Sequence, residues 1–447
     1  MNFQEKQVWC HAAGSVLALA ILLPPVGVQD GDEQLRRETL PHIQHVREQE
    51  EQLQSELQKK QGKRDRPWPD ATPVYGRAQM WRDAKFSLSY AESGLWYEAR
   101  ELMLAVDEHL VKSDGLDDAG SIRARLFLSE TYWWLGEPDE AVRLHEELLA
   151  ACQKSLGEDN TQTLNVSDRL GASFWQQDKF HQARELAQKA VDGFQKMYPT
   201  FHVDKSRALT NLGRCCGKLA DFDQAVELHV EALEGLESAE RKAEGQYGDQ
   251  ILEVMENLAM ARHDRQRYSK AQLDDLQEAQ RLQSEVLKIH KEKLGKEHPK
   301  SLWASCNLAR IEASIGALEE AEHMMRKNLP AAERTMGTDH IGTLMGKAYL
   351  GQVLTLAGEL DEAEALLSGV VKSHRARDGQ QMHPGHLVAA AFLLECYRRQ
   401  HRYRAADAME GRVLGGIKGM FGEGSPWEKY FVGHYMADTD EVISEDA

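Results

Sequence analysis

Asparagine and arginine side chains recur at matching positions along this chain, where they could recognise another protein. Asn211, Asn257 and Asn307 each lie fourteen residues before a recurring alanine, for example 225 − 211 = 14. An amide both donates and accepts hydrogen bonds, so three accessible amides on one face could bracket an extended peptide backbone. One helical turn later, Arg214 and Arg310 could hold carboxylates through paired N–H groups. These residues are candidates for a peptide-binding groove.

Two further candidates occupy the same position in other copies of the pattern, namely Arg169 and Tyr349. A second interpretation of the asparagines is that they belong to the repeat itself and only pack neighbouring helices. Solvent accessibility distinguishes the two, because a peptide ladder must be exposed along one continuous face.

Catalytic and cofactor motifs are absent from the sequence. Gly295-Lys296 is followed by Glu, and no other Gly-Lys pair completes a phosphate-binding loop. The pairs His42/His45 and His383/His386 have metal-like spacing, but both lack the two further ligands of a zinc site. "HEELL" at 145–149 lacks the second His of a zinc protease. We therefore expect no enzyme activity, no cofactor and no metal.

Charge and cysteine content narrow the partners and the compartment. The 447 residues carry a formal net charge of −18, which disfavours binding to nucleic acid. The six cysteines form no Cys-x-x-Cys pair, and five of them fall in apolar helical patterns. Free thiols of this kind suit a reducing compartment, so we expect a cytoplasmic protein.

An apolar stretch at 12–23, "AAGSVLALAILL", is too short for the roughly 20 residues of a membrane span. We expect a buried helix there. A signal peptide and a membrane anchor are the alternatives, although the start is not basic and no small-x-small cleavage site follows.

The elements that must position the candidate residues repeat with a regular period. A phrase of a turn residue, two variable positions, a polar pair and Ala ends at Ala99, Ala141, Ala183, Ala225, Ala271, Ala321, Ala363 and Ala405. The successive spacings are 42, 42, 42, 46, 50, 42 and 42 residues, so 4 and 8 residues are added around repeat five. Such a period indicates a solenoid of repeated supersecondary units.

Each unit has the apolar spacing of two helices, and no alternating run of strand length appears. Gly94, Gly136, Gly316 and Gly358 are placed to end the first helix of their units. We predict an all-α fold, a right-handed α-solenoid of about eight helix hairpins that stack on their neighbours. The eight residues added to repeat five predict a longer second helix through "SKAQLDDLQEAQRLQSEVLKIH".

"LGKEHPKSL" at 294–302 is expected to be the loop between units, with Gly295 ending one helix and Pro299 helping to begin the next. Together with "NLA" and "GALEEAE", this loop resembles the 42-residue tetratricopeptide repeat of kinesin light chains. The resemblance covers about residues 78–418. It implies that the first helices line a concave surface where extended peptides bind.

The N-terminal segment resembles a narrower group. "WCHAAGSVLALAILLPPVG", followed by "LRRETLPHIQHVREQ", is similar to the helical segment before the repeats of fungal NB-ARC/tetratricopeptide proteins, which resemble receptors of the NOD type. Trp9 and Leu40-Pro41-His42 match its ends. The resemblance implies an alternative function, the sensor arm of such a receptor without its ATPase module.

Four regions are therefore predicted. They are an N-terminal helical segment (1–60), a proline-rich linker (61–77), the repeat array (78–418) and an acidic, disordered tail (419–447). Within the first, residues 33–60 suggest a solvated charged helix or a short coiled coil. The leading functional hypothesis is a non-catalytic scaffold that binds a peptide or protein segment in its groove.

Overall fold

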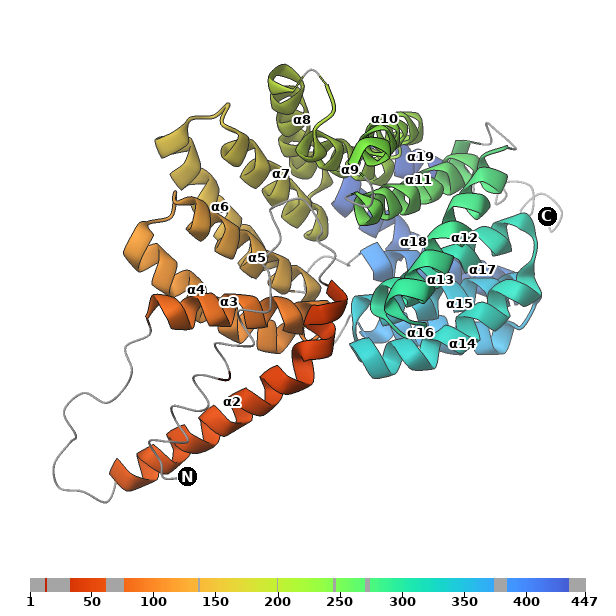
Figure 1. Ribbon diagram of the computed structural model, residues 1–447. Helices are drawn as coiled ribbons and strands as arrows, with labels where there is room; N and C mark the ends of the chain where they lie inside the picture. Colours follow the sequence, from red (N-terminus) through yellow and green to blue (C-terminus); the bar gives the residue numbers. More distant parts are fainter. Residues whose placement is uncertain are drawn as a thin grey trace, which may run out of the picture. The chain divides into compact units, whose positions relative to one another are not determined.

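Every regular element that the structure describes is a helix (Figure 1). This computed structural model describes residues 13, 33–61, 76–135, 137–198, 200–243, 247–269, 274–373 and 384–433. Apart from Ala13, the apolar stretch at 12–23 lies outside these residues, as do 62–75 of the predicted linker. The chain divides into two compact units, Met1–Ser173 and Phe174–Ala447, and each is described by itself.

The repeat array consists of first and second helices in strict alternation, which confirms the predicted α-solenoid class. The helices of unit 1 are α2 (Glu33–Gln61), α3 (Arg77–Glu92), α4 (Trp96–Asp114), α5 (Ala119–Leu135) and α6 (Pro138–Leu156), and α7 (Thr161–Gln176) contains the boundary. Unit 2 continues with α8 (Phe180–Met197), α9 (Val203–Lys218), α10 (Phe222–Ala243), α11 (Gly248–Ser269), α12 (Asp274–Leu294), α13 (Pro299–Ile315), α14 (Leu318–Met336), α15 (Ile341–Ala357), α16 (Leu360–Ser373), α17 (Pro384–Arg399), α18 (Tyr403–Phe421) and α19 (Pro426–Phe431).

A fully buried alanine marks the first turn of most second helices. Seven second helices begin three residues before an alanine that is 0–2% exposed: Ala99, Ala141, Ala183, Ala225, Ala321, Ala363 and Ala406. A side chain this small lets the two helices of a hairpin approach closely. The recurring alanine of the sequence is therefore a packing position, as predicted for all of these except the last.

Six of the second helices are preceded by a left-handed residue that lies five positions before the buried alanine. Gly94, Gly316 and Gly358 occupy it with φ of 77°, 101° and 90°, which confirms their predicted role. Three non-glycine residues hold the same conformation: Asp178, Ala220 and His401. Because 406 − 401 = 5, this register also identifies Ala406, rather than the predicted Ala405, as the packing alanine of the last hairpin.

The loop at 294–302 joins two repeats, as the sequence predicts. α12 ends at Leu294, Gly295 has a φ of 92°, and α13 begins at Pro299. The capping role of His298 was not predicted from the sequence. Its side chain accepts a hydrogen bond from the backbone N–H of Lys300 and so caps α13. His340 caps α15 in the same way.

Repeat five differs from the prediction, because more of the added length lies in its first helix than in its second. α11 has 22 residues, whereas α9 has 16 and α13 has 17. The second helix, α12, has 21 residues, against 19 in α14. The buried alanine of α12 is Ala279, which lies 42 residues before Ala321 (321 − 279 = 42). Ala271 lies outside the described residues. The added turns are held by Arg265, whose Nε lies 2.7 Å from Oδ2 of the fully buried Asp275.

The helical region also extends beyond the predicted end of the array at 418. α18 continues to Phe421, and α19 follows with Phe431 only 3% exposed. The prediction of a disordered tail from 419 is therefore wrong for residues 419–433, because their aromatic side chains are packed. Residues 434–447 lie outside the described part of the chain.

In unit 1, α2 packs on the first repeat instead of standing free in solvent or forming a coiled coil. Ile43, Val46 and Leu53 are 0%, 3% and 7% exposed, and Ile43 belongs to an apolar cluster with residues of α3 and α4. Arg82 of α3 is 5% exposed and bonds to Glu50 Oε1 at 2.7 Å. A single apolar stripe is thus enough to add α2 as a further packed helix.

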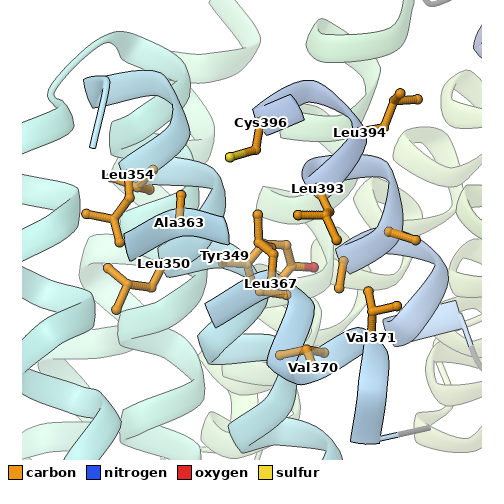
Figure 2. Close-up of a cluster of buried hydrophobic side chains, with 14 of the residues drawn as sticks. Tyr349, Leu350, Leu354, Ala363, Leu367, Val370, Val371, Leu393, Leu394 and Cys396 are labelled. Atoms are coloured by element: carbon orange, nitrogen blue, oxygen red, sulfur yellow. The ribbon is translucent and has the colours of Figure 1, made fainter. Parts of the chain in front are cut away.

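The core of unit 2 is filled by aliphatic side chains from successive helices. Figure 2 shows Leu367 of α16 between Leu350 of α15 and Leu393 of α17, and all three are at most 3% exposed. A single hairpin would leave these side chains partly exposed, so their burial depends on packing against the next repeat.

Candidate peptide-binding face of unit 2

First helices form the inner layer of unit 2. Each of α9, α11, α13 and α15 contacts the next first helix as well as its own partner, whereas no comparably extensive contact joins successive second helices in the described part of the chain. An array whose first helices lie closer together than its second helices is curved with the first helices inside. We call the inner face the surface formed by Arg214, Lys218, Asp264, Arg267 and Arg310.

An asparagine and an arginine three residues apart form the same local arrangement on two of these helices. Arg214 Nη1 lies 3.5 Å from Oδ1 of Asn211 on α9, and Arg310 Nη1 lies 3.4 Å from Oδ1 of Asn307 on α13. Residues i and i+3 are neighbours on a helix surface. The amide oxygen therefore orients the guanidinium that follows it by one turn.

An aromatic ring packs against the guanidinium group of each of these two arginines. The Arg214 guanidinium lies 4.1 Å from the ring centre of Trp175, and that of Arg310 lies 4.3 Å from the ring centre of Tyr349. Lys218 Nζ lies 5.6 Å from the same Trp175 ring. Stacking on a π face fixes the plane of a guanidinium and leaves its edge N–H groups for other partners.

The centre of the inner face joins charges from three helices. Arg310 Nη2 of α13 lies 3.6 Å from Asp264 Oδ1 of α11. Burial acts to raise the pKa of Asp264, but the hydrogen bond from His263 and the charges of Arg310 and Lys218 bring it down to about 2. Burial lowers the pKa of Lys218, against the attraction of Asp264. Asp264 is thus a permanent carboxylate among cations.

Cations outnumber carboxylates on this surface. Arg214, Lys218, Arg267 and Arg310 oppose Asp264 and, at the edge, Asp178. Burial raises the pKa of Asp178 to about 7, with Lys218 opposing the shift, so Asp178 is not fully charged near neutral pH. A surface that is locally basic within a chain of net charge −18 attracts carboxylates at short range.

The prediction of an accessible asparagine ladder is wrong for two of its three members. Asn211 and Asn307 are 8% and 2% exposed. Asn307 Nδ2 donates to Oε1 of Glu256 at 3.0 Å, which uses its amide inside the array. Asn257 is half-buried and donates to the carbonyl of Glu253 in its own helix at 2.8 Å. These amides hold neighbouring groups in place, which is closer to the packing interpretation.

The other predicted residues divide between the two units. Arg214 and Arg310 lie on the inner face, and Tyr349, 8% exposed, forms the platform beneath Arg310. Arg169 belongs to unit 1, where its charge and the burial of His145 together lower the pKa of His145 to about 3. Arg169 is therefore not among the residues of unit 2 that form the inner face.

Four residues of this surface were missed in the sequence, namely Trp175, Lys218, Asp264 and Arg267. A signal for two of them was present. Lys218 and Asp264 each lie seven residues after an asparagine of the ladder (211 + 7 and 257 + 7), which is two helical turns on the same face.

A serine, a histidine and an aspartate lie in hydrogen-bonding order beside the inner face. His263 Nδ1 is 2.8 Å from Asp264 Oδ1, and its Nε2 is 2.9 Å from Ser314 Oγ. The same order occurs in hydrolases, where the histidine activates the serine. Here His263 is fully buried, and Ser314 Oγ donates to the carbonyl of Arg310 at 3.1 Å. The contacts therefore fix His263 between two helices.

The described residues form neither a metal-binding cluster nor a membrane-spanning helix. No group of three or more His, Cys, Asp or Glu side chains is placed there to hold a metal ion. No helix in those ranges has both the length and the apolar character that crossing a membrane requires.

Comparisons with known proteins identify the repeats. The tetratricopeptide repeat family matches residues 120–196 and 268–334, and a second tetratricopeptide repeat group matches residues 208–244. The chain therefore contains tetratricopeptide repeats, as its period predicts. No curated protein matches the sequence.

Solved structures are similar to this chain at low sequence identity. NprR in complex with its cognate peptide NprX is 12% identical, with a TM-score of 0.52, over 74% of this chain and 90% of NprR. Repeats of a putative kinesin light chain from Podospora anserina are 23% identical, with a TM-score of 0.37, over 48% of this chain and 95% of theirs. BtubC from P. vanneervenii is 19% identical, with a TM-score of 0.39, over 54% of this chain and 92% of its own.

Proposed function

We propose that this chain is a non-catalytic scaffold whose inner face in unit 2 binds a peptide or protein segment that carries carboxylates. The observation that carries the proposal is the repeated arginine arrangement. Arg214 and Arg310 are each oriented by an asparagine and stacked on an aromatic ring, so their edges are pre-positioned for bidentate contacts.

The charge distribution supports an acidic ligand over a neutral one. The inner face is locally basic, while the chain as a whole carries −18. Charges farther apart than a Debye length of about 8 Å are largely screened at physiological ionic strength, so the nearby cations dominate once an acidic segment is in contact with them. Binding of this kind depends on close fit, because long-range steering does not favour it. The net charge of −18 disfavours nucleic acid as a ligand.

A relative of the same fold supports a peptide as the class of ligand to test first. NprR was solved with its cognate peptide NprX, and it shares the helical fold with this chain. The assignment to the cytoplasm rests on the thiols, since none of the five cysteines in the described residues forms a disulfide, namely Cys152, Cys215, Cys216, Cys306 and Cys396.

The test compares inner-face and outer-face arginines. A peptide-display library is screened against the full chain, and the selected peptides are titrated against R214A/R310A and against the control R281A/R334A. Arg281 and Arg334 lie on second helices with 59% and 60% of their side chains exposed. The inner-face variant is expected to bind at least tenfold more weakly, by more at low salt than at high salt.

Circular dichroism establishes that both variants keep the helical content of the natural chain. The proposal is overturned if folded R214A/R310A binds the selected peptides with unchanged affinity. It is also overturned if the outer-face control loses binding to the same degree.

A further inference from the structure

The short C-terminal helix α19 makes a contact that a simple solenoid does not make. Trp427 Nε1 donates a hydrogen bond at 2.6 Å to the backbone carbonyl of Lys218, 209 residues earlier in the chain. In a solenoid each repeat contacts its neighbours only. Lys218 is the last residue of α9, so its carbonyl is among the four that have no partner within the helix. α19 supplies that partner.

Two aromatic rings complete the place where Trp427 lies. Phe222, at the start of α10, stacks on Tyr268 of α11 with ring centres 5.5 Å apart and an angle of 16° between the planes. Trp427 meets both rings edge-on, at 5.8 Å and 83° for Phe222 and at 5.0 Å and 85° for Tyr268. We call the Lys218 carbonyl and these two rings the indole socket.

A second aromatic side chain of α19 extends the contact. Tyr430 meets Tyr268 edge-on at 4.8 Å and 88°, three residues after Trp427 on the helix. Residues i and i+3 lie on one face, so Trp427 and Tyr430 address the socket together. Phe431 is buried in the apolar core around α17 and α18, which fixes the other side of α19. In Figure 1, α19 is drawn beside α10 and α11.

The irregular repeat builds one wall of the socket. α9 ends seven residues after its asparagine (211 + 7 = 218), whereas α11 continues beyond the equivalent residue, Asp264, to Ser269. Tyr268 lies in this added part, so a repeat of regular length would not provide it. The extension is anchored by buried Asp275, which contacts Arg262 at 2.9 Å and Arg265 at 2.7 Å. The added turns therefore form a fixed surface.

We infer that the indole socket is a protein-interaction site and that α19 is its tethered ligand. The partner is a short helical segment with a tryptophan followed three residues later by a tyrosine, the pattern that α19 itself presents. Such a segment takes the socket when α19 leaves it. The inference rests on the proposed function only in treating unit 2 as a surface that binds protein segments.

The tether explains why α19 holds the socket at rest. Only residues 422–425 separate α18 from α19, and Gly422 and Gly424 both have positive φ, at 86° and 73°. A linker this short gives a tethered ligand an effective concentration in the millimolar range or above. A free segment competes only if it binds more tightly, or if α19 is weakened. The socket is thus gated by the chain's own C-terminal region.

The experiment uses the chain's own helix as the probe. A fluorescein-labelled peptide of residues 423–433 (EGSPWEKYFVG) is titrated by anisotropy against the full natural chain, W427A, Y430A and the control K429A. Lys429 is exposed on the same helix. The peptide is expected to bind W427A at least tenfold more tightly than the natural chain or K429A, with Y430A between them. The same peptide with Trp replaced by Ala is expected not to bind.

A second substitution locates the binding. Y268A in the W427A chain should abolish the gained affinity, while R214A/R310A in that chain should change it less than twofold. The latter result separates this inference from the proposed acidic-peptide site, so either can fail without the other.

Several results overturn the inference. One is equal peptide binding by the natural chain and W427A, and another is no binding by W427A or Y430A when both are folded. If both variants instead lose their helical signal, α19 is a permanent part of the fold and the inference is likewise rejected.

Discussion

Replacing Glu256 with glutamine should stabilise this protein at alkaline pH and have little effect in mild acid. Glu256 Oε1 accepts hydrogen bonds from Asn307 at 3.0 Å and from Gln283 at 3.3 Å. Burial raises the pKa of Glu256 to about 7, although these two hydrogen bonds act to lower it. Glutamine keeps the accepting oxygen and carries no charge at any pH.

The sign follows from proton binding. Between pH 4.5, the ordinary pKa of a glutamate, and pH 7, the folded chain holds a proton on Glu256 that the unfolded chain has released. Stability therefore falls as the pH rises through this range and stays low above it. A difference of 7 − 4.5 = 2.5 pKa units corresponds to about 3 kcal/mol at 1.36 kcal/mol per unit. Because Glu256 keeps partial solvent contact, about 1 to 3 kcal/mol is expected.

The assay compares thermal and urea midpoints of the natural chain, E256Q and the control E292Q from pH 5 to 8.5. Glu292 is exposed on α12, so its substitution removes the same charge without changing a buried contact. The pKa of Asp178 is also raised by burial, but that effect is common to all three proteins and cancels in the differences. An advantage of E256Q that does not grow with pH, or a loss of stability at pH 8, would refute the reasoning.

Three further predictions concern packing, backbone strain and catalysis. A Cβ on Gly213 would lie 2.8 Å from the buried ring of His229. The substitution G213A should therefore lower the free energy of unfolding, measured by denaturation, by about 1 to 3 kcal/mol. G217A, whose nearest neighbour would be 3.9 Å away, should be neutral or slightly stabilising. A220G relieves a positive φ of 64° and should raise the thermal midpoint by an amount equivalent to about 1 kcal/mol. Hydrolysis of p-nitrophenyl acetate should be equal for the natural chain and S314A, and a serine-dependent rate would contradict the assignment of Ser314 as structural.

The helical repeats could be predicted from the sequence because they depend on local and periodic features. A small residue recurs at a spacing of 42 in most repeats, and in six of them a left-handed residue stands five positions before it. Both are requirements of one hairpin and need no knowledge of distant residues. The prediction placed Ala271 and Ala405 where the buried residues are Ala279 and Ala406, because a small residue close to the packing position mimics it.

The location of the added residues in repeat five could not be predicted in the same way. Extra turns can lengthen either helix of a hairpin without changing the apolar stripe. The deciding contact is between Arg265 and Asp275, which come from different helices and look like ordinary surface charges in the sequence. The resemblance of residues 9–27 and 35–49 to NB-ARC proteins remains a prediction, because only the second of these stretches, in α2, lies in the described part of the chain apart from Ala13, and a packed helix does not distinguish that family.

The contact between α19 and the indole socket could not be predicted for a different reason. Trp427 and Lys218 are 209 residues apart, and no period connects them. The acidic residues near the end of the chain suggested disorder, whereas Trp427, Tyr430 and Phe431 of α19 are in contact with other helices of unit 2. Contacts of this kind depend on how far the array curves, which is set by many small packing differences along the first helices.

The proposed binding face shows how finely a sequence period can place residues in a helical repeat. The period placed Asn211 and Arg214 on one helix face, but it did not separate the two residues. On a helix of 3.6 residues per turn, positions i and i+3 differ by about 60° around the axis. This rotation is enough to separate a buried position from a partly exposed one. Asn211 is 8% exposed, whereas Arg214 is half-buried and lies against the ring of Trp175. The same division separates Asn307 from Arg310, so the ligand contacts are expected one turn later than the most regular residue type in the sequence.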